Sequence, residues 1–212
     1  MKKIALILAV MFASTLVSAQ ISFGPKIGYN TSKLSIDKSD IKTELKNSFQ
    51  FGLFARLGTK YYLQPELNWL TQGGVFKKPG DEGSLSPFKQ EIKLNTVQVP
   101  ALIGIELIDL KVANIRAMAG PVASFVTNKE IESTDGDEYI KPIEQADIQD
   151  IVWSAQLGVG VDVLMFTLDV RYNLGLNKVI GEVDYEENGE MKSLNFDSRT
   201  SGFNVSLGWK IF

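Results

Sequence analysis

The sequence predicts an all-β fold, a roughly eight-stranded antiparallel up-and-down transmembrane β-barrel. Three observations predict it: apolar and polar residues alternate with a period of two, the connections are alternately short and long, and small residues gather on the polar face. The 212-residue chain has a net charge of −3 and 44% hydrophobic residues, values that an ordinary soluble domain would also show. The patterning, and not the average composition, therefore carries the prediction.

The first 19 residues have the pattern of a secretory signal peptide. Two lysines precede an apolar stretch, residues 4–13, and Val17 and Ala19 stand at the −3 and −1 positions before Gln20. A transmembrane anchor is the alternative, but this stretch is shorter than the roughly 20 residues that a spanning helix needs. We expect residues 1–19 to be cleaved and residues 20–212 to form one barrel domain, inserted into the membrane by strands.

The first four alternating segments cover about residues 21–30, 47–58, 62–69 and 97–106. Their apolar positions are Phe23, Ile27 and Tyr29, then Phe49, Phe51, Leu53 and Leu57, then Leu63, Pro65, Leu67 and Trp69, and finally Val97, Val99, Ala101, Ile103 and Ile105. The alternation departs from period two near Asn95 to Val97, which allows a β-bulge there.

The last four segments cover about residues 115–125, 153–163, 168–175 and 203–211. Their apolar positions are Ile115, Ala117, Ala119, Ala123 and Phe125, then Trp153, Leu157, Val159, Val161 and Val163, then Leu168, Val170, Tyr172 and Leu174, and finally Phe203, Val205, Leu207, Trp209 and Ile211. Most segments reach the about nine to eleven residues that a tilted transmembrane strand requires.

The connections between the segments differ in length. Tight connections lie near residues 58–60, 108–111 and 164–165, and long polar ones cover about residues 31–46, 73–91, 128–149 and 177–199. Short periplasmic turns and long external loops are typical of outer-membrane barrels. Loops of this length would count against the strand assignment in a compact soluble domain.

Side-chain size separates a membrane barrel from a soluble, lipocalin-like barrel, which would show the same alternation. Bulky residues occupy the apolar face, and the polar face carries Gly24, Gly28, Gly52, Gly104, Gly120, Gly158, Gly160, Gly175 and Gly208. Because an eight-stranded barrel has little interior volume, the small residues belong inside and the bulky residues face lipid.

Charged residues fall on the same face as the glycines. They are Lys26, Arg56, Arg116, Arg171 and Lys210, with Glu66, Glu106, Asp162 and Asp169 as their counterparts. Five positive and four negative groups in a narrow lumen are expected to pair and fill it. The sequence therefore predicts a plugged interior and disfavours passive diffusion through an open pore.

Aromatic residues near the strand ends are candidates for an interfacial girdle. They are Tyr29, Trp69, Trp153 and Trp209, and a random spread of surface aromatics is the alternative. The last segment ends at Phe212, and we expect this C-terminal strand to be recognised by the barrel-assembly machinery. Outer-membrane lipid is the other expected partner.

The chain contains no cysteine and no histidine, which weighs against catalysis and excludes a disulfide or a thiolate metal site. A Ser/Lys site or a carboxylate pair such as Asp162 with Asp169 is conceivable, but these carboxylates more simply neutralise the nearby Arg171. The short sequence Gly158-Val159-Gly160 lies within a strand and lacks the following helix of a nucleotide-binding loop. We expect no enzymatic activity and no cofactor.

The third and fourth long connections are acidic. The densest cluster of oxygen ligands, Asp135, Asp137 and Glu138, could bind Ca²⁺ or a basic ligand, but a solvated loop is the favoured interpretation, because the spacing matches no ordered calcium loop. Nucleic-acid binding is disfavoured, because no basic patch with interleaved aromatics is present and the loops are acidic.

Six stretches of the chain resemble the PorT-like outer-membrane β-barrel family of Bacteroidota. They are YYLQPELNW at residues 61–69, LNTVQVPALIGIE at 94–106, RAMAGPVASF at 116–125, LGVGVDV at 157–163, LDVRYNLGLNKV at 168–179 and the closing strand. The resemblance implies a barrel in the cell outer membrane, with loops that diverge between members. It allows either a structural or ligand-binding surface barrel or an accessory role in protein secretion.

Overall fold

The computed structural model describes residues 21–35, 42–44, 46–78, 88–110, 112–134, 148–179, 182–187, 190–195 and 199–211. The predicted signal peptide, the candidate metal ligands Asp135, Asp137 and Glu138, and Phe212 lie outside the described residues. Among the residues that the structure describes, no helix is long and apolar enough to cross a membrane.

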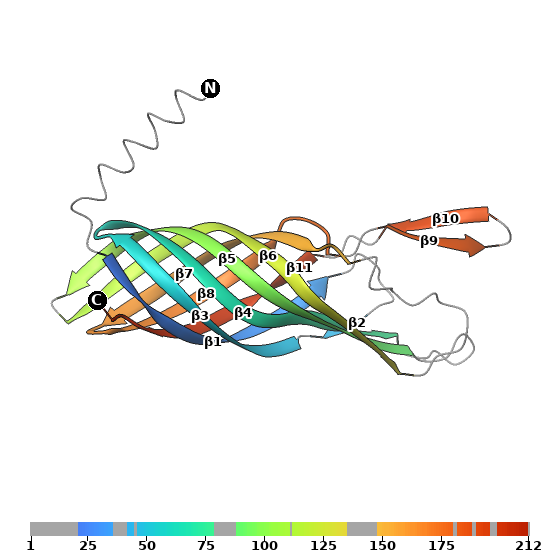
Figure 1. Ribbon diagram of the computed structural model, residues 1–212, viewed down its shortest axis with the longest axis horizontal. Coiled ribbons are helices and arrows are strands. Elements are labelled where there is room, and N and C mark those ends of the chain that lie inside the picture. The colour runs from blue at the N-terminus through green and yellow to red at the C-terminus, as the bar shows by residue number, and fades with distance from the viewer. Residues whose placement is uncertain are drawn as a thin grey trace, which may run out of the picture.

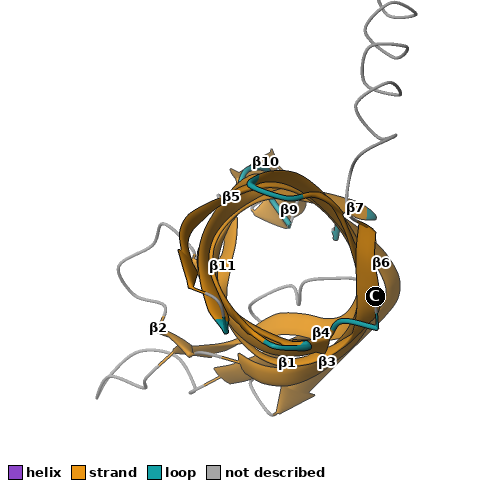
Figure 2. Ribbon diagram, turned by 90° about the vertical axis from the view of Figure 1, so that its left-hand side faces the viewer, coloured by secondary structure: helices purple, strands orange, loops and turns teal. Residues whose placement is uncertain are grey.

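Eight antiparallel strands close into a barrel, seen along its axis in Figure 2. The barrel strands are β1 (Ile21–Ser35), β3 (Lys46–Gly58), β4 (Tyr61–Lys78), β5 (Phe88–Leu110), β6 (Ala113–Thr134), β7 (Ile151–Val163), β8 (Phe166–Gly175) and β11 (Arg199–Trp209). Each pairs with its neighbours along the chain, and the pairing of β1 with β11 closes the ring. The predicted all-β up-and-down barrel is confirmed.

Three short strands lie outside this ring. The strand β2 (Lys42–Glu44) pairs with the outer end of β4, and β9 (Glu182–Glu187) pairs with β10 (Glu190–Asn195) in a separate two-stranded hairpin. This hairpin lies beyond one end of the barrel, and β11 ends at the opposite end (Figure 1). Among the described residues, this hairpin therefore lies at the end opposite to the C-terminal end of β11 (Figure 1), as expected for an external loop.

The strands extend further into the long connections than the sequence predicted. Pairing of β4 with β5 continues to Lys78 and Phe88, and pairing of β5 with β6 continues to Lys89 and Thr134. The predicted loop at residues 177–199 contains the hairpin of β9 and β10. Strands can pair through backbone hydrogen bonds without alternating apolar and polar side chains. Where neither face of a sheet meets lipid, the sequence therefore lacks the alternation from which strand ends are predicted.

Side chains alternate between the lumen and the outer surface, with the apolar set outside. Phe49 is 82% exposed on the outer face of β3, whereas Arg116 on the inner face of β6 is fully buried. Two aromatic rings, Phe54 and Tyr62, also point inward, and glycines give them room: a Cβ at Gly104 would overlap the Tyr62 ring. The inward placement of small residues therefore follows from the size of their neighbours in the lumen.

The pairing of β5 with β6 contains two register shifts. One lies between Asn95 and Thr96, where the alternation in the sequence departs from period two. The other lies between Glu106 and Ile108, close to the turn at the end of the hairpin, and no signal in the sequence predicted it. Both Leu107 and Ile108 are exposed there, because a bulge lets consecutive side chains leave the same face.

The closing seam between β1 and β11 leaves no room for a side chain at Gly202. A Cβ at this position would overlap the carbonyl oxygen of Thr31, a backbone atom that cannot move without breaking the ladder. We expect Gly202→Ala to lower the free energy of unfolding by at least about 2 kcal/mol, measured by urea titration of the barrel refolded in detergent. The neighbouring Ser201→Ala should change it little, and equal stability of both variants would contradict this.

Candidate functional site

A cluster of ionised side chains occupies the lumen. Its members, here called the lumen cluster, are Lys26 from β1, Arg56 from β3, Glu66 from β4, Arg116 from β6, Asp162 from β7, Asp169 and Arg171 from β8, and Lys210 directly after β11. Seven of them are at most 4% exposed, and the Lys210 side chain is 18% exposed. Residues up to 184 positions apart are thus brought together by the closed ring.

Glu66 is the centre of one half of the cluster. Arg171 donates from Nη1 and Nη2 to the two carboxylate oxygens of Glu66, at 2.9 and 2.7 Å, and Lys26 Nζ lies 2.9 Å from Oε2. Gln64 and Asn68, on the same strand, donate amide hydrogen bonds to this carboxylate at 2.7 and 3.0 Å. Glu66 therefore accepts five hydrogen bonds, which offset its removal from water.

Asp162 is the centre of the other half. Arg56 Nη1 lies 2.6 Å from Oδ2 of Asp162, Arg116 Nη2 lies 2.8 Å from Oδ1, and Lys210 Nζ lies 3.3 Å from Oδ2. Three cations therefore surround one carboxylate near the short-turn end of the barrel. This half of the cluster therefore carries excess positive charge, part of which Asp169 offsets through Arg116.

Asp169 joins the two halves. Its Oδ1 lies 2.8 Å from Arg116 Nη2, and its Oδ2 lies 2.5 Å from Arg171 Nη2. The Tyr62 hydroxyl accepts a 3.0 Å hydrogen bond from Arg116, and the Arg56 guanidinium lies 5.0 Å from the Tyr62 ring centroid. The lumen cluster is therefore one continuous network that links six barrel strands and the chain after β11.

Glu106, which the sequence placed in the lumen network, does not join it. Its side chain is half-buried, and it forms no ion pair with the other charged lumen residues that the structure describes. Although Glu106 pairs with Arg116 in the ladder, the Arg116 guanidinium reaches inward to Asp162 and Asp169. The register shift that follows Glu106 sets this residue at the end of the barrel. The cluster therefore has five cations and three carboxylates.

The neutral partners in the lumen were not identified from the sequence as site residues. Tyr62, Gln64 and Asn68 alternate with the apolar positions Leu63, Pro65 and Leu67 of the same strand, but alternation carries no information on which cation or carboxylate they contact. Thr167 is a further example, since its hydroxyl accepts from Arg116. Their only signal was a hydrogen-bonding side chain on the face that also carries the charges.

Towards the long loops the lumen is lined by neutral side chains. Asn204 donates to Asn30, Asn30 donates to Gln50, and Gln98 donates to Ser124, at 2.6, 2.9 and 3.0 Å. A cavity of about 20 Å³ remains among such residues, which is room for one water molecule. Within the described residues no group of three acidic side chains could hold a metal ion.

The four predicted girdle residues differ in exposure. Tyr29, Trp153 and Trp209 are 41%, 50% and 50% exposed on the outer surface, with Trp153 near the start of β7 and Trp209 at the short-turn end of β11. Trp69 is partly buried, because its ring stacks on Phe51 with a centroid distance of 5.4 Å. Contact of these residues with the membrane interfaces stays a prediction.

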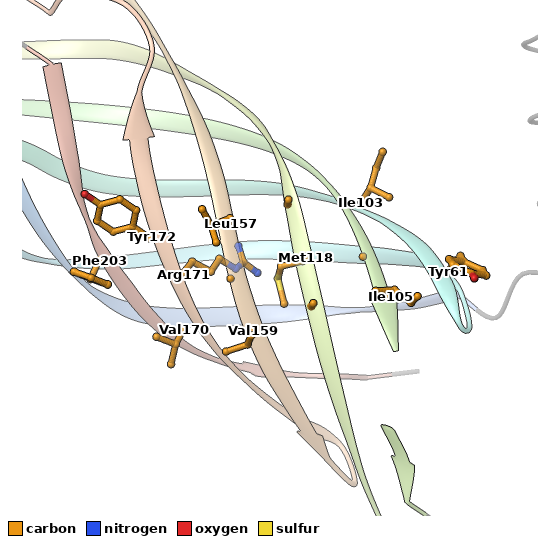
Figure 3. A pocket seen from close by; sticks show the side chains of 14 residues that line it. Tyr61, Ile103, Ile105, Met118, Leu157, Val159, Val170, Arg171, Tyr172 and Phe203 are labelled. Atoms are coloured by element: carbon orange, nitrogen blue, oxygen red, sulfur yellow. The ribbon is translucent and has the colours of Figure 1, made fainter. Parts of the chain in front are cut away.

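A much larger hollow lies on the outer surface of the barrel (Figure 3). Its volume is about 690 Å³, and it is lined by outward-facing side chains of β5 to β8, together with Tyr61 and Phe203. Four inward-facing positions, Gly104, Met118, Gly158 and Arg171, also line it, and Arg171 belongs to the lumen cluster as well.

Comparison with known proteins agrees with this architecture. A family model described as outer membrane protein beta-barrel domain matches residues 12–181. A search of curated proteins found no match.

Three solved structures of similar shape are outer-membrane or surface proteins. The chain is similar to Ail of Yersinia pestis, crystallised with the heparin analogue sucrose octasulfate, at 13% identity over 91% of this chain and 99% of that chain, with a TM-score of 0.43. It is also similar to Neisserial surface protein A, at 11% identity over 91% of this chain and 99% of that chain, with a TM-score of 0.43. The third is the outer membrane protein OprG of Pseudomonas aeruginosa, at 12% identity over 90% of this chain and 94% of that chain, with a TM-score of 0.44.

Removal of the Glu66 carboxylate should destabilise the barrel strongly. We expect Glu66→Gln to lower the free energy of unfolding by about 3–5 kcal/mol, because Lys26 and Arg171 would lose their shared counter-charge in a buried site. The matched control is Glu106→Gln, which should stay within about 0.5 kcal/mol of the wild type. Urea titration with refolding into detergent measures both, and a Glu66→Gln barrel as stable as the control would contradict the central role of this carboxylate.

Proposed function

The chain belongs to the outer membrane protein β-barrel domain family, and from this premise we propose that it is a non-enzymatic surface barrel with a plugged lumen. In this proposal the protein contributes to envelope structure or binds an external ligand through its long loops. The observation that carries it is the lumen cluster, which crosses the interior from β1 to β8. The barrel is then a rigid platform, and any specific contact lies outside the membrane.

Two features support the plug. The ion pairs connect opposite walls of the lumen, for example Glu66 of β4 with Arg171 of β8 and Arg56 of β3 with Asp162 of β7. Opening a path for solutes would separate buried opposite charges, which costs several kcal/mol for each pair. The cavity of about 20 Å³ among the neutral lumen side chains that the structure describes has room for one water molecule and for no larger solute.

The carboxylates of the lumen support the absence of catalysis. Asp162 and Asp169, the pair that the sequence offered as a candidate acid and base, each contact at least two arginines and are at most 3% exposed. Carboxylates that are paired with arginines and shielded from solvent are poorly suited to transfer protons to a substrate. A histidine that could serve instead is absent from the chain.

The location proposed is the cell outer membrane, reached by way of the N-terminal signal peptide. The lipid-facing apolar surface supports it, and so does the family. We also propose that the C-terminal strand, which ends at Phe212, is recognised by the barrel-assembly machinery. The hairpin of β9 and β10 extends the external end and is available to a ligand outside the cell (Figure 1).

A second candidate is an accessory role in protein secretion across the outer membrane. The resemblance of the strand sequences to the PorT-like family of Bacteroidota supports it, for example LGVGVDV at residues 157–163. Both candidates use the same barrel and differ only in the partner of the loops.

The plug predicts an electrically silent barrel. The mature protein reconstituted in planar bilayers should give no stable conductance steps, because paired charges fill the lumen. A porin inserted in the same bilayers tests the sensitivity of the recording. Reproducible steps from the wild-type protein would contradict the plugged lumen.

Deletion of the gene separates the two candidate functions. We expect the secreted and surface-exposed proteins, quantified by mass spectrometry against the parent strain, to be unchanged if the protein is a structural or ligand-binding barrel. Selective loss of exported cargo, restored by expression of the intact chain, would instead establish the secretion role.

A further inference from the structure

The hollow on the outer surface is a groove between two rows of paired residues. In the first row Tyr61 pairs with Ile105, Ile105 with Ala117, Ala117 with Val159, and Val159 with Val170. The second row consists of Ile103, Ala119, Leu157, Tyr172 and Phe203, paired in the same order across β5, β6, β7, β8 and β11. A groove that follows cross-strand pairs runs perpendicular to the strands.

The depth of the groove comes from small residues. Between the two rows lie the inward-facing positions Gly104, Met118, Gly158 and Arg171, and the two glycines have no side chain on either face. The walls are lowest at Ala117 and Ala119, in the middle of the groove, whereas the neighbouring Ile103 and Leu157 are 67% and 52% exposed. The result is an almost purely apolar channel of about 690 Å³.

The length and inclination of the groove match one leaflet of a membrane. Four steps between strands, from Tyr61 on β4 to Val170 on β8, span about 19 Å at a spacing of about 4.8 Å. With strands tilted by about 40°, this path rises about 12 Å along the membrane normal. A single leaflet contributes about 15 Å of hydrocarbon. An extended acyl chain that lies obliquely in one leaflet therefore fits the groove.

The two ends of the groove differ. Tyr61 is 70% exposed at the short-turn end, and the exposed Lys60 precedes it in the turn. At the other end the rings of Tyr172 and Phe203 lie in contact, with a centroid distance of 4.8 Å, and Figure 3 shows Tyr61 and Phe203 at opposite ends of the lining side chains. A basic and an amphipathic residue thus stand where the polar end of a lipid would lie.

From these features we propose that the groove holds one acyl chain of a phospholipid of the periplasmic leaflet, with the lipid phosphate at Lys60. The groove is continuous with the lipid-facing surface of the barrel, so hydrocarbon already surrounds it in the membrane. Lys60 complements the negative charge of a phosphate. The proposal depends on the outer-membrane location but on neither the plugged lumen nor the loops, so it stands or fails independently of them.

Native mass spectrometry of the full mature barrel, titrated in mild detergent with a palmitoyl-oleoyl phosphatidylethanolamine, tests the proposal. The wild type should retain one lipid molecule. Ala119→Phe, which fills the groove at its lowest wall, should weaken binding by about tenfold, because it displaces about two methylene groups. The matched control is Ala123→Phe, an outward-facing alanine of the same strand that does not line the groove, and it should bind like the wild type.

A substitution of Lys60 tests the proposed position of the lipid phosphate. Lys60→Ser should weaken phosphatidylethanolamine binding by about threefold and leave binding of a diacylglycerol, which has no phosphate, unchanged. Equal lipid binding by the wild type and Ala119→Phe, or an equal loss in Ala123→Phe, would overturn the proposal. So would a wild-type dimer that excludes lipid and dissociates in Ala119→Phe, because a second copy would then occupy the groove. Altered gel mobility on heating verifies that every variant is folded.

Discussion

The ion pairs of the lumen constrain the whole barrel, because ionised side chains surrounded by strands and lipid persist only when each charge has a partner. Glu66 and Arg171 are one example, with a two-point contact between β4 and β8 across the interior. The ion pairs also fix the register of the strands. A shift by one residue would turn Arg116 and Arg171 towards lipid, at a cost of about 2–4 kcal/mol for each arginine near the middle of the membrane.

Glycines make this network possible by standing opposite the longest inward side chains. Arg116 pairs with Gly160, Arg171 with Gly158, and Lys26 with Gly208 in the ladders. A Cβ at Gly158 would lie 2.7 Å from Cγ of Arg171, so a larger residue would displace the guanidinium from its carboxylates. The glycine-rich face and the charged face coincide because a narrow barrel can hold long side chains only where their neighbours have none.

The sequence predicts the barrel well because period-two alternation records which face of each strand meets lipid, and this is a local property. It predicts the members of the lumen cluster for the same reason. It could not predict the pairing of Lys26 with Glu66, or the exclusion of Glu106, because these depend on how distant strands meet after closure and on a register shift near a turn. The outer ends of β5 and β6 escaped prediction because lipid no longer selects their side chains.

The inner and outer surfaces of this barrel are coupled through the same positions. Gly158 gives Arg171 room inside the lumen, and together with Gly104 it forms the floor of the groove outside. The two glycines make the barrel wall thin on the lumen side, because no side chain covers the backbone there. The outward-facing Ala117 and Ala119 make the same wall thin on the lipid side. A wall so thin packs poorly unless each face is filled, by the arginine network on one side and by hydrocarbon on the other. The packing of the charged lumen and the contact with lipid therefore both depend on residues of β5, β6, β7 and β8.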